Sequence, residues 1–154
     1  MTRASVVERP VPLHMELSSQ MIVGGLAAAA LDTLYMELGH ATHVAVDLGD
    51  GHASVHVERL LRPRADVVIR VGQYFEGGSR RGGHFLIAAP EMVFVRTQAG
   101  WSPVSLRNDF LGGAPARGEE SDLVELVQRD LVDFANAWLG NIQERLVMAA
   151  RRAA

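Results

Sequence analysis

The sequence predicts a two-layer α+β fold, in which an antiparallel meander sheet of about six strands packs on an N-terminal helix and a long C-terminal helix. Apolar residues recur at helical spacing near both ends of the chain and alternate with polar residues through the middle. Short turns rich in Gly, Pro and Asp separate the middle segments. At 154 residues the chain suits one domain, which we expect at residues 17–154 after an N-terminal arm of residues 1–16.

The first helix is predicted to begin at Ser18 or Ser19 and to end at Leu38, because a serine can cap its start and Gly39 can terminate it. Its apolar face consists of Leu31, Leu34, Tyr35 and Leu38. The arm before it contains RPVP, and its prolines favour extended backbone in their neighbours.

The pair Gly24-Gly25 leaves two interpretations of this helix open. The glycines and the alanines after them can form a smooth side that another backbone approaches closely. Alternatively, the first turn is frayed and the helix begins near Leu26, since each glycine costs a helix about 1 kcal/mol relative to alanine.

The segment THVAVDLGDGHASVHVE predicts a β-hairpin, because Asp50-Gly51 is a typical two-residue hairpin turn. With the turn there, Leu48 faces Ala53, Val46 faces Val55 and Val44 faces Val57. All the apolar partners then share one side, and a slip of one residue would destroy the match. We therefore expect the valines to face the helices and the histidines to face water.

Four further strands are expected in the stretches DVVIRVGQYF, HFLIAA, MVFVRTQ and WSPVSL. In the first of these, Val67, Ile69, Val71 and Phe75 alternate onto one face, and Arg70 and Tyr74 onto the other. We place the break between HFLIAA and MVFVRTQ at Ala89-Pro90-Glu91.

The final helix is predicted to begin at Ser121, with acidic residues in its first turn and arginines toward its end. Its apolar stripe consists of Val127, Leu131, Phe134, Trp138, Ile142 and Leu146. Unbroken to Arg152, it would be about 46 Å long, whereas a compact domain of this size is roughly 35–40 Å across. Either Gly140 bends or breaks the helix, or its end projects and packs on something else.

The composition excludes several kinds of chemistry. All 15 basic residues are arginine, and the chain contains neither lysine nor cysteine. A P-loop lysine, Schiff-base chemistry and a pyridoxal phosphate linkage are therefore excluded. Thiol nucleophiles, disulfides, thiolate zinc sites and iron–sulfur clusters are excluded too. We expect no cofactor, and a non-enzymatic role is the first interpretation.

The charge balance argues against a nucleic-acid or membrane-surface protein, since 18 acidic and 15 basic residues give a net charge of −3. The longest apolar run, from Met21 to Leu31, is shorter than the about 20 residues that span a bilayer. Glu8 and Glu16 lie upstream of it, where a signal peptide carries basic residues. We expect a cytoplasmic protein that binds neither membrane nor nucleic acid, encoded in a GC-rich, bacterial genome.

The stretch FEGGSRRGGHF places Arg80 and Arg81 between two glycine pairs. It lacks the lysine of a Walker loop, and a strand rather than a helix follows it, unlike a dinucleotide fingerprint. It is not a nucleophile elbow either, because the residue two after Ser79 is an arginine. We interpret it as a hairpin tip with two exposed arginines. The functional alternative is that they contact an acidic surface on a partner, or nucleic acid.

A possible metal site follows from the hairpin register. His43 is expected opposite Glu58, with His56 on the same polar face. Two imidazoles and a carboxylate are the ligand set of a facial metal triad. The alternative is that the wet face of an antiparallel sheet carries polar residues, histidines included.

A possible ligand cavity lies between the sheet and the final helix. Phe75, Phe85, Phe94 and Phe134, together with Trp138, would line a pocket for a lipid-like or aromatic ligand. The alternative is that these residues fill the core.

The layout of an N-terminal helix, a strand meander with a DG turn and a long final helix containing NIQERL resembles that of small secretion-chaperone-like proteins. It resembles the helix-grip ligand binders less closely. The glycine loop takes the place of a middle helix that the chaperone-like proteins usually have.

These observations predict a non-enzymatic protein-binding module, such as an adaptor, a chaperone or an assembly component, that binds another protein or pairs as a homodimer. Helix surface and sheet edges would form the contact, with Trp138 and Ile142 contributing from the final helix. Arg80 and Arg81 would set orientation at the rim. The alternatives are a small apolar-ligand binder or cyclase-like enzyme that uses the sheet–helix cavity, and a metal-dependent enzyme at the histidine site.

Overall fold

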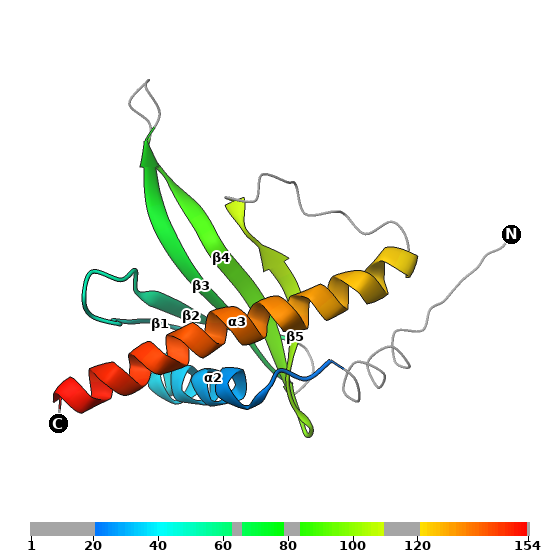
Figure 1. Cartoon of the computed structure of the whole chain (residues 1–154), viewed down its shortest axis with the longest axis horizontal. Helices are drawn as coiled ribbons and strands as arrows, with labels where there is room; N and C mark the ends of the chain where they lie inside the picture. Colours follow the sequence, from blue (N-terminus) through cyan, green and yellow to red (C-terminus); the bar gives the residue numbers. More distant parts are fainter. Residues whose placement is uncertain (1–20, 63–65, 79–83, 110–120, 154) are drawn as a thin grey trace, which may run out of the picture.

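The computed structural model describes residues 21–62, 66–78, 84–109 and 121–153, with only the backbone placed at 77–78, 84–85 and 121–127. Within these residues the fold is α+β, as predicted: two helices pack on one face of a five-stranded antiparallel sheet (Figure 1). The arm predicted at residues 1–16 lies outside the described residues, as does most of the loop that precedes the final helix.

The strands form a meander in which each strand pairs with the next one along the chain. They are β1 His43–Val46, β2 Val55–Leu60, β3 Val67–Gly78, β4 His84–Thr97 and β5 Gly100–Arg107. β3 and β4 extend beyond their neighbours as a long hairpin (Figure 1).

The hairpin predicted at Asp50-Gly51 is confirmed. Val44 pairs with Val57 and Val46 with Val55, in the predicted register. Asp50 and Gly51 both have positive φ, 52° and 75°, and the N–H of His52 donates to the carbonyl oxygen of Gly49 over 3.0 Å. These are the features of a type I′ turn, so local turn chemistry fixes the register. The strands part after Val46, so this turn closes a loop of residues 47–54.

The sheet has five strands where about six were predicted, because HFLIAA and MVFVRTQ belong to the single strand β4. The predicted break between these two segments is therefore wrong. The ladder between β3 and β4 shifts between Gly72 and Tyr74, so that Ala89 and Pro90 together stand opposite Gln73. This is a β-bulge, a position where a strand tolerates proline because the ladder is already interrupted. The proline therefore marks a bulge within a strand and not a break between two.

α2 spans Gly25–Leu38, as the second interpretation of the glycine pair expects. The prediction of an uninterrupted helix from Ser18 or Ser19 is wrong, because residues 21–24 are not helical. The N–H of Val23 donates to the carbonyl oxygen of Trp101 over 3.0 Å, which ties this segment to β5. Hydrogen bonding to the sheet thus replaces the helical hydrogen bonds that would extend α2.

Gly39 and Arg59 provide the contacts at the C-terminal end of α2. Gly39 takes a positive φ of 56°, as expected, and its N–H donates to the carbonyl oxygen of Tyr35. The Arg59 guanidinium of β2 donates to the Gly39 carbonyl over 2.5 Å and lies 5.4 Å from the centre of the Tyr35 ring.

α3 spans Ser121–Ala153 and crosses the sheet diagonally without a break at Gly140 (Figure 1). Its 33 residues make it about 50 Å long. Its last turns rest on the β1–β2 loop, where Arg152 pairs with the Asp50 carboxylate at 2.5 Å and Arg145 hydrogen-bonds to His52. The C-terminal end of α3 therefore packs on the β1–β2 loop, in agreement with the prediction that the end of an unbroken helix packs on something else. No helix in the described part of the chain, α3 included, combines the length and apolarity needed to cross a bilayer.

The core lies between the sheet and both helices. Val57, Ile69 and Phe94 from three adjacent strands pack with Leu34 of α2 and Leu139 of α3, and all five side chains are fully buried. The apolar faces predicted for β1–β3 and for α2 therefore point inward, and the polar residues between them point to the opposite side of the sheet.

Candidate functional site

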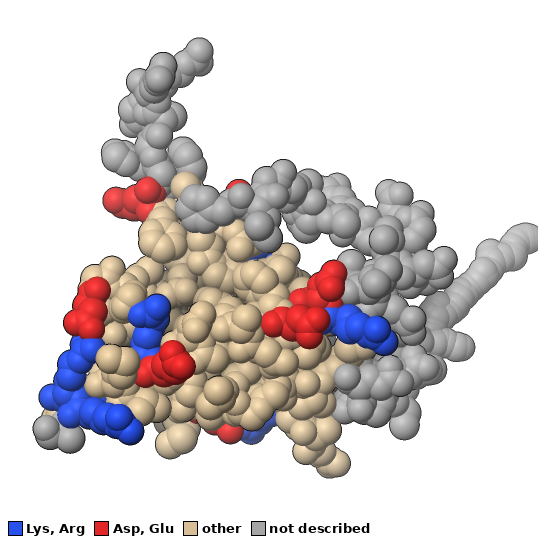
Figure 2. All heavy atoms as spheres, viewed as in Figure 1, with Lys and Arg blue, Asp and Glu red and all other residues tan. Residues whose placement is uncertain are grey.

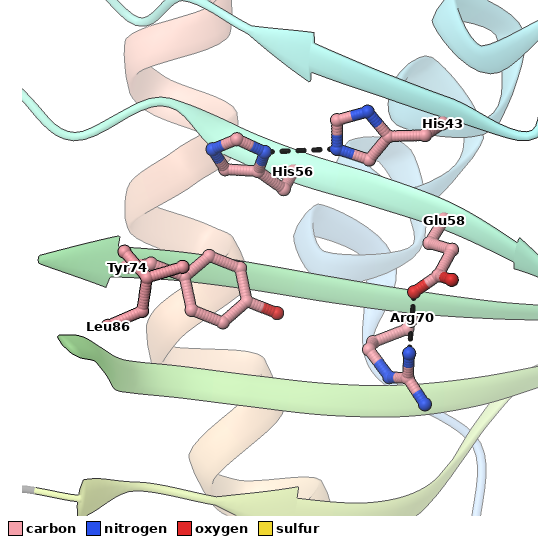
Figure 3. Close-up of a pocket in the computed structure, with 6 residues that line it drawn as sticks. All are labelled: His43, His56, Glu58, Arg70, Tyr74 and Leu86. Atoms are coloured by element: carbon pink, nitrogen blue, oxygen red, sulfur yellow. Dashed lines mark hydrogen bonds and ion pairs between the residues drawn. The ribbon is translucent and has the colours of Figure 1, made fainter.

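A cluster of polar side chains occupies the second face of the sheet, which neither α2 nor α3 covers (Figure 3). We call this the outer face and define the cluster by His43, His56, Glu58, Arg70, Tyr74 and Glu91. All of these except Glu91 line an open pocket of about 330 Å³, which Leu86 completes. The residues that alternate with the cluster, such as Val57, Val71 and Met92, lie in the core.

Two histidines form one side of the cluster. Nε2 of His43 and Nδ1 of His56 lie 3.0 Å apart, so one nitrogen donates a hydrogen bond to the other. The two rings are stacked, with centroids 5.2 Å apart and planes inclined by 26°. The Tyr74 ring meets His56 edge-on at 5.5 Å. His56 is thus held between two rings, while His43 remains exposed at the edge strand β1.

Charged residues form the other side of the cluster. The Arg70 guanidinium pairs with the Glu58 carboxylate at 2.5 Å, and its Nε lies 3.9 Å from the carboxylate of Glu91. The Tyr74 hydroxyl donates to Glu91 over 2.7 Å. Arg70 Nε is buried and has no hydrogen-bond partner among the described residues. Two carboxylates therefore share one guanidinium, which leaves this group with one net negative charge.

The surroundings shift two protonation equilibria. Burial raises the pKa of the Tyr74 phenol, and the hydrogen bond to Glu91 adds to the rise. The phenol therefore stays protonated at neutral pH and continues to donate to the carboxylate. Burial lowers the pKa of His56, and the neighbouring His43 lowers it further. His56 is therefore neutral at pH 7, with a lone pair on one ring nitrogen.

The structure brings together only part of the predicted metal site. His43 and His56 meet, and Glu58 stands opposite His43 in the ladder as predicted. The Glu58 carboxylate, however, is directed to Arg70 (Figure 3). Among the described residues, no three His, Asp or Glu side chains converge in an arrangement that would hold a metal ion. The three-ligand site stays a prediction that would require Glu58 to leave Arg70.

The predicted partner-binding residues fall in different places. Ile142 is 2% exposed and belongs to the core, so a partner cannot reach it in the folded chain. Trp138 is partly buried on α3, and its indole N–H donates to Oε1 of Gln73 over 2.9 Å. Arg80 and Arg81 lie outside the described residues.

The predicted cavity residues do not all meet, because Phe94 lies far from Phe75. Phe94 is fully buried in the core, opposite Ile69 of β3. Phe75 is six residues further along β3, about 20 Å away, and is 46% exposed. Phe134 packs against the core from α3, and the side chain of Phe85 lies outside the described residues. Phe94 and Phe75 are therefore too far apart to line one small cavity.

No protein-family model, curated protein or solved structure matches this chain. The resemblance to secretion-chaperone-like proteins is therefore a likeness of layout, with no matching relative to support it. Function has to be inferred from the geometry of the two sheet faces.

Sequence reasoning missed the links that join Arg70 and Tyr74 to Glu91. Arg70 and Tyr74 were expected on the polar face, but their partners depend on how β4 aligns with β3. The bulge opposite Gln73 sets that alignment, because it leaves Gly72 beside Glu91. Pro90 was the available signal in the sequence, because proline within a strand is confined to bulges, strand starts and edges.

Proposed function

We propose that this protein is a non-enzymatic protein-binding module that works as a homodimer. The contact surface lies on the helix-bearing face of the sheet, where the β3–β4 hairpin extends beyond α3 (Figure 1). We name it the hairpin shoulder and define it by Phe75, Ile87, Phe134 and Trp138. The proposal rests on the Phe75 ring, which is 46% exposed, together with Ile87, Phe134 and Trp138, which are partly buried. Contiguous apolar surface left accessible to solvent marks interaction sites in soluble proteins.

Hydrogen bonds hold the inner border of the shoulder in place. Gln73 accepts the indole N–H of Trp138 and donates from its own amide to the carbonyl oxygen of Ala53 over 3.0 Å. Phe75 follows Gln73 by two residues on the same face, about 7 Å along the strand. Ile87 faces Phe75 across the β3–β4 ladder, and the Phe134 ring lies 6.4 Å from that of Trp138. Anchored aromatic residues of this kind are enriched among the residues that dominate binding energy.

The charge distribution around the shoulder favours a protein partner. No residue between Phe134 and Gln143 is charged, whereas Asp133 and Glu144 flank that stretch. In Figure 2 the charged residues of α3 gather toward its two ends, with an uncharged surface between them. An uncharged centre with a charged rim is typical of protein–protein interfaces. The sequence predicts Arg80 and Arg81, which lie outside the described residues, as further members of this rim.

The shoulder is a better contact than the sheet edges, which were expected to contribute. β1 is only four residues long, and β5 is interrupted by a register shift opposite Val93 and Phe94. Short and bulged edge strands resist continuous pairing with another strand. A second copy that presents its own shoulder would form a self-complementary contact about a two-fold axis.

Light scattering after size-exclusion chromatography tests the proposal. We expect a dimer mass for the wild-type chain between about 1 and 100 μM, and a monomer mass for Phe75→Asp. Leu86→Asp is the matched control, because Leu86 is 64% exposed on the same hairpin but lines the outer-face pocket. Leu86→Asp should remain dimeric. Circular dichroism should confirm that both variants are folded.

A strictly monomeric wild-type chain over this range would refute the homodimer. Equal effects of Phe75→Asp and Leu86→Asp would refute the assignment to the shoulder. In either case native mass spectrometry of the purified chain should be examined for a retained apolar ligand, which would support the small-ligand alternative.

A further inference from the structure

We propose that His43 and His56 form a two-imidazole chelate for a divalent late-transition-metal ion, of the class of Cu(II) or Ni(II), on the outer face of the sheet. This site is separate from the hairpin shoulder, which lies on the opposite face. It differs from the facial triad predicted from the sequence, because Glu58 is not one of its ligands.

The separation of the two nitrogens supports the assignment. Two metal–nitrogen bonds of roughly 2.05 Å place their nitrogens roughly 2.9 Å apart when they meet at a right angle, and roughly 3.3 Å apart at the tetrahedral angle. Nε2 of His43 and Nδ1 of His56 are 3.0 Å apart. The separation is therefore that of neighbouring ligands in square-planar or octahedral coordination, the geometry that Cu(II) and Ni(II) adopt, and is short for tetrahedral zinc.

The pair is held by rigid elements. β1 and β2 fix the two Cα atoms through their ladder, in which Ala45 faces His56 and His43 faces Glu58. The Tyr74 ring supports His56 from the side, and the hydrogen bond to Glu91 fixes that ring. Metal binding then needs only small ring rotations and a change of tautomer, in which the shared proton moves to the other nitrogen of its ring. No net charge has to be moved for this change.

The electrostatic surroundings favour a cation over an anion. Glu58 and Glu91 contribute two negative charges and Arg70 one positive charge, which leaves one net negative charge beside the histidines. Neutral imidazole nitrogens suit late transition metals, whereas Mg²⁺ and Ca²⁺ prefer oxygen ligands. His43 is exposed, so an ion can reach the pair from solvent and complete its coordination with water.

Isothermal titration of the full chain with Cu²⁺, Ni²⁺, Zn²⁺ and Mg²⁺ tests the site. We expect one Cu²⁺ or Ni²⁺ per chain, weaker binding of Zn²⁺ and none of Mg²⁺. His43→Ala and His56→Ala should each weaken Cu²⁺ binding by about ten-fold or more. His40→Ala is the matched control, because this exposed histidine lies at the end of α2, away from the cluster, and it should bind like the wild type.

Electron paramagnetic resonance of the Cu(II) complex gives an independent readout, with hyperfine splitting from two imidazole nitrogens expected. Glu58→Gln should leave the affinity within about three-fold of the wild type, and a loss of about ten-fold or more would overturn the two-imidazole assignment. Unchanged binding in both His43→Ala and His56→Ala, or a spectrum without nitrogen coupling, would overturn the site itself. Neither substitution touches the hairpin shoulder, so this test is independent of the homodimer.

Discussion

Gly72 lies beneath the Tyr74 ring at the centre of the outer face, and replacing it with alanine tests how this face is held together. A Cβ added at Gly72 would stand 2.5 Å from the Tyr74 hydroxyl oxygen and 2.7 Å from the ring carbon that bears it. Both distances are far below about 3.5 Å, the shortest favourable van der Waals separation of nonbonded carbon atoms. We therefore expect the ring to swing away and the hydrogen bond from Tyr74 to Glu91 to be lost.

The magnitude follows from two opposed contributions. A hydrogen bond to a charged group contributes about 1.5–3 kcal/mol, while alanine in a strand regains about 0.5–1 kcal/mol relative to glycine. We expect Gly72→Ala to lower the free energy of unfolding by about 1–2 kcal/mol. In a Tyr74→Ala background the clash and the hydrogen bond are both absent, so the same substitution should raise the free energy of unfolding by about 0.5–1 kcal/mol. The predicted effect therefore changes sign.

Urea denaturation of the wild type, both single variants and the double variant gives the coupling energy between the two positions. If Gly72→Ala changes the free energy of unfolding equally, within about 0.5 kcal/mol, in the wild-type and the Tyr74→Ala backgrounds, the two residues are energetically independent. That result would refute the reasoning, because it would show that Tyr74 does not constrain position 72.

Three further predictions concern α3, the core and the pH dependence of stability. Gly140→Ala should raise the free energy of unfolding by about 1 kcal/mol in urea denaturation, because the position lies inside a helix and an added Cβ meets nothing within 4 Å. If stability does not rise, α3 bends or frays at this point. Leu139→Ala should lower the free energy of unfolding by about 2–5 kcal/mol, because this fully buried side chain packs in the core. A loss below about 1 kcal/mol would mean that α3 does not pack on the sheet at this position. The pKa of His56 is lower in the folded chain than its ordinary value of 6.5, so the unfolded chain binds the proton more tightly and stability is lost as the pH falls below about 6.5. Measured in EDTA-containing buffer at about pH 7.5 and 5.5, the wild type should lose more stability than His56→Gln, and equal losses would contradict the lowered pKa.

The elements that the sequence predicted well depend on local chemistry. Asp50-Gly51 determines a type I′ turn by itself, and a single register then puts every valine of that hairpin on one face. The end of α2 at Gly39 follows from a residue type that ends helices, and α3 begins at Ser121, where its start was predicted. The elements that were predicted wrongly depend on partners distant in the chain. The start of α2 is set by the hydrogen bond between Val23 and Trp101, which no local pattern reveals.

The amino-acid sequence alone determined the two-layer class, the hairpin register and the pairing of His43 with Glu58 in the β1–β2 ladder, because turn chemistry and residue alternation act over a few neighbouring residues. It also excluded lysine and cysteine chemistry by the absence of both residues. Only the tertiary structure decided that Pro90 sits in a bulge, that Glu58 turns to Arg70, that Ile142 is buried and that Phe75 is 46% exposed. Those outcomes depend on how β4 aligns with β3 and on where a helix of about 50 Å crosses the sheet. Both are settled by packing between segments far apart in the chain, which local patterns do not encode.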